Sequence, residues 1–176
     1  MQIHIFTEGA ETTTEDANTE LRNYYSGLFR QARKLEDDLS KYGDVELHIV
    51  SKEFGTASGE EQTENVIDKR VEKPMDAIRN DLRSAADGDV VVILLSTDVF
   101  EDTVSTIWPE LIEEAESKSI WCLGASSSAL NSVPLEQLED KGCSLITYQR
   151  VGVARLGTET RETLYEMVKR TAENIA

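Results

Sequence analysis

Short apolar runs typical of β-strands alternate along the chain with longer amphipathic runs typical of α-helices. Parallel strands need a crossover of a dozen or more residues, which is commonly a helix, so this alternation predicts a sheet covered by helices on both faces. The run at 90–95 is continuously apolar, as expected of a central strand. The strand-like runs are 2–6, 45–50, 89–95, 119–123 and 144–148. The helix-like runs are about 18–42, 65–86 with a possible break at Pro74, 104–117, 135–140 and 158–174. We therefore predict an α/β fold, a single three-layer Rossmann-like domain over residues 1–176 with a mostly parallel sheet of about five strands.

The chain is strongly acidic, with 34 Asp and Glu against 18 Lys and Arg and a formal net charge of −16. Duplex nucleic acid repels such a surface at long range, because binding phosphates requires clustered cations. Two explanations of the charge are open. One is an acidic surface on an ordinary cytoplasmic protein. The other is a cytosol of molar salt, where the Debye length is about 3 Å and self-repulsion is screened. The composition resembles that of haloarchaeal proteins, and this predicts a fold that loosens when salt is removed.

Several signals are missing from the sequence. No apolar run approaches the ~20 residues of a membrane helix, and residues 1–9 lack the pattern of a signal peptide, so we expect a cytoplasmic protein. Cys122 and Cys143 are predicted to be free buried thiols, with a disulfide between neighbouring strands as the alternative. His4 and His48 lie in strands, on the face opposite their apolar neighbours, and are expected under a helix or at an edge. With no zinc-type spacing of Cys or His, no metal site is predicted.

The loops that follow the strands are the expected ligand site, because open α/β sheets bind ligands beyond the carboxyl ends of their strands. These loops are rich in Ser, Thr and Gly. Glu53 and Asp98, with Glu8, are candidate general bases or sugar contacts, although 34 acids make chance placement a competing explanation. The candidate ligand-binding residues in these loops are Ser51, Lys52, Gly124 and Ser126. The 124–128 loop lacks the Walker A and GxGxxG patterns, so a turn with hydroxyl caps is its alternative.

Three arginines near the end of the chain stand out against the acidic composition. Arg150, Arg155 and Arg161 fall within twelve positions. Arg suits bidentate recognition of phosphate or carboxylate, so one interpretation is an anion clamp. The other is that the three residues form salt bridges with neighbouring acidic helices, each worth about 0–1 kcal/mol.

Two short segments carry a resemblance to a known family. They are Tyr25-Ser26-Gly27-Leu28-Phe29-Arg30 and Val50-Ser51-Lys52-Glu53-Phe54-Gly55. Together they resemble small α/β proteins related to bacterial peroxide-stress proteins and to a domain of archaeosine synthase. The resemblance implies a glycosylase-like fold, a link to nucleic-acid or nucleobase modification, and roles for Tyr25, Ser26, Arg30, Ser51, Lys52, Phe54 and Gly55. The chain departs from the family pattern after Gly55, where residues 56–59 replace a stretch containing Pro.

Two classes of function follow. In the first, the protein binds or modifies a nucleotide, nucleoside or nucleobase at the carboxyl edge of the sheet, with a small anionic or nucleobase-containing ligand as its partner and no cofactor identified. In the second, it is a non-enzymatic homo-oligomeric scaffold or regulatory protein, such as a homodimer, that uses helices 18–42 and 158–174 as its interface. Trp108 and Trp121 would then be interface anchors, unless they pack in the core.

Overall fold

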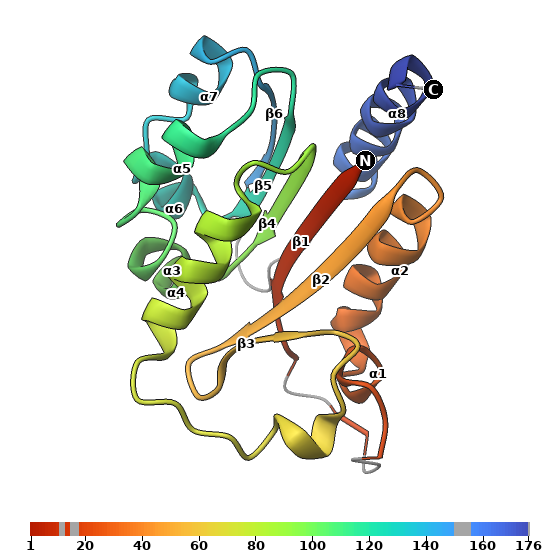
Figure 1. Cartoon of the computed structure of the whole chain (residues 1–176), viewed down its shortest axis with the longest axis vertical. Helices are drawn as coiled ribbons and strands as arrows, with labels where there is room; N and C mark the ends of the chain where they lie inside the picture. The colour runs from red at the N-terminus through yellow and green to blue at the C-terminus, as the bar shows by residue number, and fades with distance from the viewer. Residues whose placement is uncertain (11–12, 15–17, 150–155, 176) are drawn as a thin grey trace.

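The computed structural model describes residues 1–10, 13–14, 18–149 and 156–175. These residues form one α/β domain around a six-stranded sheet (Figure 1). The strand order is β3-β2-β1-β4-β5-β6, and every neighbouring pair is parallel except β2 and β3. The strands are β1 (Gln2–Glu8), β2 (Asp44–Ser51), β3 (Gly55–Ser58), β4 (Val90–Leu94), β5 (Ile120–Ala125) and β6 (Ser144–Gln149). The predicted α/β class and mostly parallel sheet are confirmed, with five parallel strands and one antiparallel edge strand.

Helices cover both faces of the sheet and give the domain three layers (Figure 1). One face packs against α1 (Leu21–Tyr24), the short helix η1 (Gly27–Phe29), α2 (Arg30–Leu39) and α8 (Thr158–Ile175). The other packs against α3 (Pro74–Ala85), α4 (Thr97–Asp102), α5 (Trp108–Glu114), α6 (Ser127–Asn131) and α7 (Glu136–Asp140). A further short helix, η2 (Thr63–Asn65), follows β3.

Strand β4 lies at the centre of both cores. All five of its residues are buried. Val90, Val92 and Leu94 point into the core under α2 and α8, whereas Val91 and Ile93 point into the core under α3 and α5. Burying one such side chain stabilises the fold by about 1.5–3 kcal/mol. Burial on both faces of the sheet therefore explains why the sequence of β4 does not alternate between apolar and polar residues.

The structure corrects the predicted helix boundaries. The helix expected over 65–86 begins only at Pro74, where the missing backbone N–H costs nothing. The helix expected over 18–42 is interrupted because Tyr25 adopts an extended conformation and forms an antiparallel bridge with Thr13. Residues 56–64 lie between the predicted strand at 45–50 and the predicted helix at 65–86, and they contain most of β3, which pairs with the end of β2.

Both cysteines and both tryptophans belong to the interior. Cys122 and Cys143 are buried and free, as predicted, and burial raises the pKa of the Cys122 thiol to about 12. Trp108 and Trp121 are buried core residues, so neither is an interface anchor. None of the helices in the described ranges is both long and apolar enough to cross a membrane.

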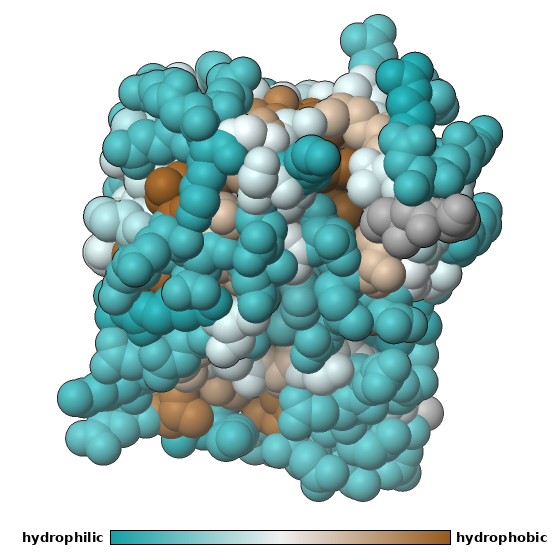
Figure 2. Space-filling model, turned by 45° about the horizontal axis from the view of Figure 1, so that its top comes forward, coloured by the Kyte–Doolittle hydropathy of each residue, from teal (hydrophilic) through white to brown (hydrophobic). Residues whose placement is uncertain are grey.

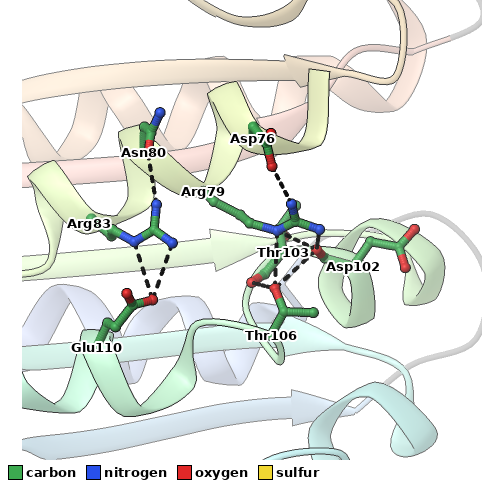
Figure 3. A network of polar contacts seen from close by, with 8 residues as sticks. All are labelled: Asp76, Arg79, Asn80, Arg83, Asp102, Thr103, Thr106 and Glu110. Carbon is green, nitrogen blue, oxygen red and sulfur yellow. Dashed lines mark hydrogen bonds and ion pairs between the residues drawn. The ribbon is translucent and has the colours of Figure 1, made fainter. Parts of the chain in front are cut away.

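Two arginines on α3 hold this helix against its neighbours (Figure 3). Arg79 donates from Nε and Nη2 to the carbonyl oxygen of Asp102 at 2.9 and 2.6 Å, at the end of α4. Arg83 pairs with Glu110 of α5 at 3.2 Å.

Polar side chains cover most of the face seen in Figure 2, with smaller apolar areas between them. The acidic residues therefore lie mainly outside a well-packed interior.

Candidate functional site

The carboxyl edge of the sheet has a switch point between β1 and β4. The chain leaves β1 toward β2 on one side and reaches β4 on the other side. Ligands of doubly wound folds bind at this position. Here it is occupied by a carboxylate, because Glu8 accepts hydrogen bonds from the backbone N–H of Ser96 at 2.5 Å and from its Oγ at 3.1 Å. A fixed negative charge at this point disfavours a phosphate group.

The two predicted ligand residues on β5 and after it have structural roles. Ser126 is the N-cap of α6, where its Oγ accepts from the backbone N–H of Ala129 at 3.2 Å. The same oxygen lies 2.6 Å from Oγ1 of Thr97. Gly124 is a buried residue of β5 and pairs with Leu94. This arrangement matches a turn with hydroxyl caps, the alternative considered for the 124–128 loop.

A pocket of about 530 Å³ opens beyond the carboxyl ends of β1 and β2. It lies beside the switch point, on the side of the sheet where β2 is found. Three of the predicted site residues, Ser51, Lys52 and Glu53, line it, whereas Gly124, Ser126 and Arg161 do not. Among the described residues, the lining consists of Glu8, Gly9, Ala10, Thr13, Tyr24, Tyr25, Val50, Ser51, Lys52, Glu53, Phe54, Ile67, Asp68 and Arg70.

One wall of this pocket is aromatic. Tyr24 and Tyr25 contact each other edge to face, with ring centroids 5.3 Å apart, and Phe54 lies on the same lining. Gly9 is required here because any Cβ at this position would overlap the ring of Tyr25. Burial, together with nearby Tyr24 and Glu53, raises the pKa of Tyr25 to about 12. The Tyr25 hydroxyl therefore keeps its proton at neutral pH and can donate a hydrogen bond.

The pocket lining also has a polar part. Ser51 Oγ donates to Glu53 Oε2 at 2.6 Å and accepts from the backbone N–H of Glu53 at 3.0 Å. Lys52 reaches across to Asp98 in the first turn of α4, with 3.7 Å between Nζ and Oδ2. The structure thus brings Ser51, Lys52 and Glu53 together, and Asp98, which is not part of the lining, contacts Lys52 with an exposed side chain. All four residues were predicted from their positions after strands.

The charges of the pocket are mixed but acidic in balance. Within the part of the chain that the structure describes, its lining contains three carboxylates, Glu8, Glu53 and Asp68, and two cations, Lys52 and Arg70. Arg70 already donates from Nη1 to two backbone carbonyl oxygens, at 3.2 and 3.1 Å. The pocket therefore offers more hydrogen-bond acceptors with negative charge than free cationic donors.

Of the three arginines in the predicted anion clamp, the described residues include Arg161. Arg150 and Arg155 lie outside the described residues. Arg161 is in the first turns of α8, a helix that packs against β5, β6 and α2. Its neighbour Tyr165 donates a hydrogen bond to Asp38 at 2.9 Å. The anion clamp stays a prediction.

Sequence reasoning missed a cluster of titratable groups on the sheet. His4 and His48 lie under a helix, as predicted, but they also meet, with 2.9 Å between His4 Nδ1 and His48 Nε2. Burial and the neighbouring His48 lower the pKa of His4. Burial alone would raise the pKa of Asp81, but hydrogen bonds from His48 and Thr56 leave it lowered. Glu46 completes the cluster from the same strand as His48. The alternation in the sequence places Glu46 and His48 on the same face of their strand. Adding His4 to the cluster requires knowing that β1 lies beside β2.

No family model matches the chain, and no curated protein sequence matches it either. Among solved structures, it is similar to a flavodoxin of Streptococcus pneumoniae TIGR4, with 11% identity, 99% of both chains covered and a TM-score of 0.43. It is also similar to a diflavin flavoprotein A3 from Nostoc sp., with 13% identity, 98% of this chain and 92% of that one covered, and a TM-score of 0.46. A third similarity is to rubredoxin oxygen:oxidoreductase from Desulfovibrio gigas, with 12% identity, 98% of this chain but 35% of that one covered, and a TM-score of 0.38. Similarity at this level assigns no function to the chain, and the resemblance to peroxide-stress proteins stays a prediction.

Proposed function

We propose that the pocket beside β1 and β2 binds a small aromatic ligand of the nucleoside or nucleobase class. Its volume of about 530 Å³ falls within the roughly 300–1,000 Å³ typical of small-molecule sites. The observation that carries the proposal is the pairing of an aromatic wall with a row of carboxylates. Tyr24 offers a half-buried ring on which a base can stack, and Glu53 accepts hydrogen bonds from hydroxyl or amino groups.

The charge balance favours an uncharged ligand over its phosphate ester. Glu8 is already held at the switch point, where doubly wound folds commonly bind an anion. With three carboxylates against two cations, a doubly charged phosphate would meet net repulsion. This narrows the expectation from the sequence, which included nucleotides and other anionic ligands, to nucleosides and free bases.

The family resemblance points in the same direction. Four of its seven residues, Tyr25, Ser51, Lys52 and Phe54, line this pocket. A fifth, Gly55, begins β3 immediately beyond it with φ at +83°, a conformation that favours glycine. The resemblance connects these positions with nucleobase chemistry, and that connection supports a nucleobase-type ligand here.

The test is a thermal-shift screen in molar KCl with matched pairs of nucleoside and nucleotide. Adenosine with AMP and guanosine with GMP are the core pairs, and riboflavin with FMN adds the ring system for which the structural neighbours are named. A ligand at 100 times its Kd stabilises the fold by about 2.7 kcal/mol. For a chain of this length that corresponds to a Tm shift of about 5–10 °C. We expect the nucleoside of at least one pair to give a larger shift than its phosphate.

Two tyrosine variants localise the effect. Tyr24→Ala removes the proposed stacking ring, whereas Tyr42→Ala removes a half-buried tyrosine that lies beside the amino end of β2, away from the pocket. Stacking of a base on an aromatic ring is worth about 1–3 kcal/mol. Tyr24→Ala should therefore abolish most of the ligand shift, and Tyr42→Ala should keep it. No shift with any compound, together with a dimer in sedimentation, would favour the scaffold alternative.

Glu53 and Asp98 are the candidate bases if the ligand is converted as well as bound. Glu53 lines the pocket and is fixed by Ser51, whereas Asp98 is joined to the rim through Lys52. Product chromatography after incubation with the bound nucleoside shows whether the ligand is converted, and variants of the two carboxylates show which of them is the base. Loss of turnover in Glu53→Gln with retained binding identifies Glu53 as the base, and unchanged turnover in both Glu53→Gln and Asp98→Asn removes both from that role.

A further inference from the structure

Two histidines and a glutamate meet on the face of the sheet that α3 covers. His4 lies on β1 directly opposite Glu46 of β2, and His48 follows Glu46 by two positions. Alternate residues of a strand point to the same face, so all three side chains share one face. None of them lines the pocket described above. The cluster is therefore a separate feature of the fold.

The three side chains place their ligand atoms in a compact triangle. His4 Nδ1 lies 2.9 Å from His48 Nε2 and 3.6 Å from Glu46 Oε2, and His48 Nε2 lies 3.8 Å from the same oxygen. The point in the plane of this triangle that is equidistant from the three atoms lies about 2.0 Å from each. An ion displaced from that plane toward a fourth ligand lies about 2.1 Å from each, within the usual range of Zn–N and Zn–O bond lengths. A tetrahedral site would separate its ligand atoms by about 3.3 Å, close to the mean of these distances.

A second layer of contacts fixes the direction of His48. Its Nδ1 donates to Oδ2 of Asp81 on α3 at 2.8 Å, and that carboxylate also accepts from Thr56 Oγ1 at 2.6 Å. An ionised carboxylate only accepts hydrogen bonds, so the proton of His48 is on Nδ1 and the lone pair of Nε2 faces His4 and Glu46. Phe6 stacks on the imidazole with ring centroids 4.2 Å apart. A carboxylate that orients a histidine from behind is the usual outer layer of a zinc site.

We propose that His4, Glu46 and His48 bind one zinc ion, with a water molecule in the fourth position. Two imidazole nitrogens and one carboxylate oxygen are ligands that Zn²⁺ accepts, whereas Mg²⁺ and Ca²⁺ take oxygen ligands. The Glu46 side chain is 56% exposed, which leaves a path for the ion and its water, while His4 and His48 are 12% and 6% exposed. Gly88 keeps this arrangement possible, because a Cβ there would lie 2.8 Å from Cδ2 of His4.

A simple hydrogen bond between the two histidines is the competing explanation. It satisfies both rings but gives Glu46 no role, although the Glu46 carboxylate lies within 3.8 Å of both ring nitrogens. Zinc accounts for all three groups and for the Asp81 contact behind them. The ion would join β1 to β2 directly and both strands to α3 through Asp81. Its main effect would be on the stability of the domain.

The test is a Zn²⁺ titration of the full chain after treatment with EDTA and removal of the chelator. Molar KCl suppresses weak binding to the many surface carboxylates, because it screens exposed charges. We expect one Zn²⁺ per chain and a rise in Tm on binding. Co²⁺ substitution reports the geometry, since tetrahedral Co²⁺ absorbs visible light far more strongly than octahedral Co²⁺.

Matched variants assign the ligands. Glu46→Gln removes an exposed carboxylate without changing side-chain size, and Asp44→Asn is its control, two residues earlier on the same strand with an exposed side chain. Asp81→Asn changes a residue behind the ligands and should weaken Zn²⁺ binding by about 10–100-fold. His4→Gln removes a ligand itself and should therefore weaken binding by more than about 100-fold. Glu46→Gln should abolish one-to-one binding, and Asp44→Asn should leave it intact. Absence of stoichiometric binding in the wild type, equal affinity in Glu46→Gln and Asp44→Asn, or an octahedral Co²⁺ spectrum would overturn the proposal.

Discussion

Arg22 on α1 is paired with Glu36 on α2, and replacing it with Leu tests how the pocket wall is held. Arg22 Nε donates to Glu36 Oε1 at 2.6 Å, and Nη2 donates to Asp37 Oδ1 at 2.9 Å. The Arg22 and Glu36 side chains are only 22% and 14% exposed. The one-turn helix α1 also carries Tyr24 of the pocket wall. Arg22→Leu therefore leaves a mostly buried carboxylate without its cation.

The expected cost lies between the limits for exposed and buried pairs. Removing one partner of a fully buried pair costs about 3–5 kcal/mol, and an exposed pair is worth about 0–1 kcal/mol. For this half-buried pair we expect a loss of about 1–3 kcal/mol in the free energy of unfolding. Burial raises the pKa of Glu36 while Arg22 opposes that rise, so the Leu variant should raise it further. Protonation of Glu36 then limits the cost.

The pH dependence follows from this shift. A carboxyl group whose pKa is higher in the folded state than in the unfolded state stabilises the fold progressively as pH falls through the folded pKa. The deficit of Arg22→Leu relative to the wild type should therefore be largest near about pH 8 and shrink toward about pH 5. Urea unfolding followed by circular dichroism in molar KCl measures the deficit at both values. Arg170→Leu, which breaks the exposed pair with Glu166, should cost no more than about 0.5 kcal/mol.

Two results would refute this reasoning. One is a deficit that stays the same at both pH values, which would mean that lost packing and not the unpaired carboxylate is responsible. The other is a double variant, Arg22→Leu with Glu36→Gln, whose loss equals the sum of the single losses. Residues that interact directly should show coupling of about 0.5–3 kcal/mol in such a cycle.

Four further outcomes are expected. Dialysis from molar to millimolar KCl should loosen the fold, and an unchanged circular dichroism spectrum would count against the salt-adapted reading of the charge. Gly9→Ala should weaken nucleoside binding because its Cβ displaces the Tyr25 ring, and calorimetric affinity equal to wild type would contradict this. Trp121→Ala should lower the free energy of unfolding by about 3–5 kcal/mol, since the side chain is fully buried; a loss below about 1 kcal/mol in urea would contradict it. Burial alone would raise the pKa of Asp38, but hydrogen bonds from Lys34 and Tyr165 and the nearby lysines leave it lowered. Ionised Asp38 therefore stabilises the fold, and this stabilisation is lost as pH falls through the pKa of the folded state. Tyr165→Phe should reduce that acid-dependent loss.

The alternation of apolar runs was sufficient to predict the α/β class, because parallel strands covered on both faces leave a strong signal in 90–95 and 120–123. Strand β3 left none. Its four residues, Gly55–Ser58, are small or polar and gain their strand conformation from pairing with β2. The start of α3 at Pro74 was visible only as a possible break, since the residues before it also suit a helix.

The candidate site was predictable in part, for reasons of connectivity. Ser51, Lys52 and Glu53 follow one strand, so the carboxyl-edge rule places them together without knowledge of strand order. Tyr24 belongs to the segment 18–42, for which the sequence predicts one continuous helix. Its place at the pocket depends on the end of α1 at Tyr24, where Tyr25 becomes extended. The zinc ligands depend on the pairing of His4 with Glu46 across neighbouring strands, 42 positions apart in the sequence. Such a pairing follows from strand order, which the sequence does not state.

The most direct test of the ligand site is an amide NMR titration of the labelled protein in molar KCl with the nucleoside that gives the largest thermal shift. Binding in the proposed pocket should move the signals of Gly9, Ser51, Lys52 and Phe54, which line it, and leave those of Gly124 and Ser127 unchanged. Shifts centred on Gly124 of β5 and Ser127 of α6, or no saturable shifts at all, would contradict a ligand site beside β1 and β2.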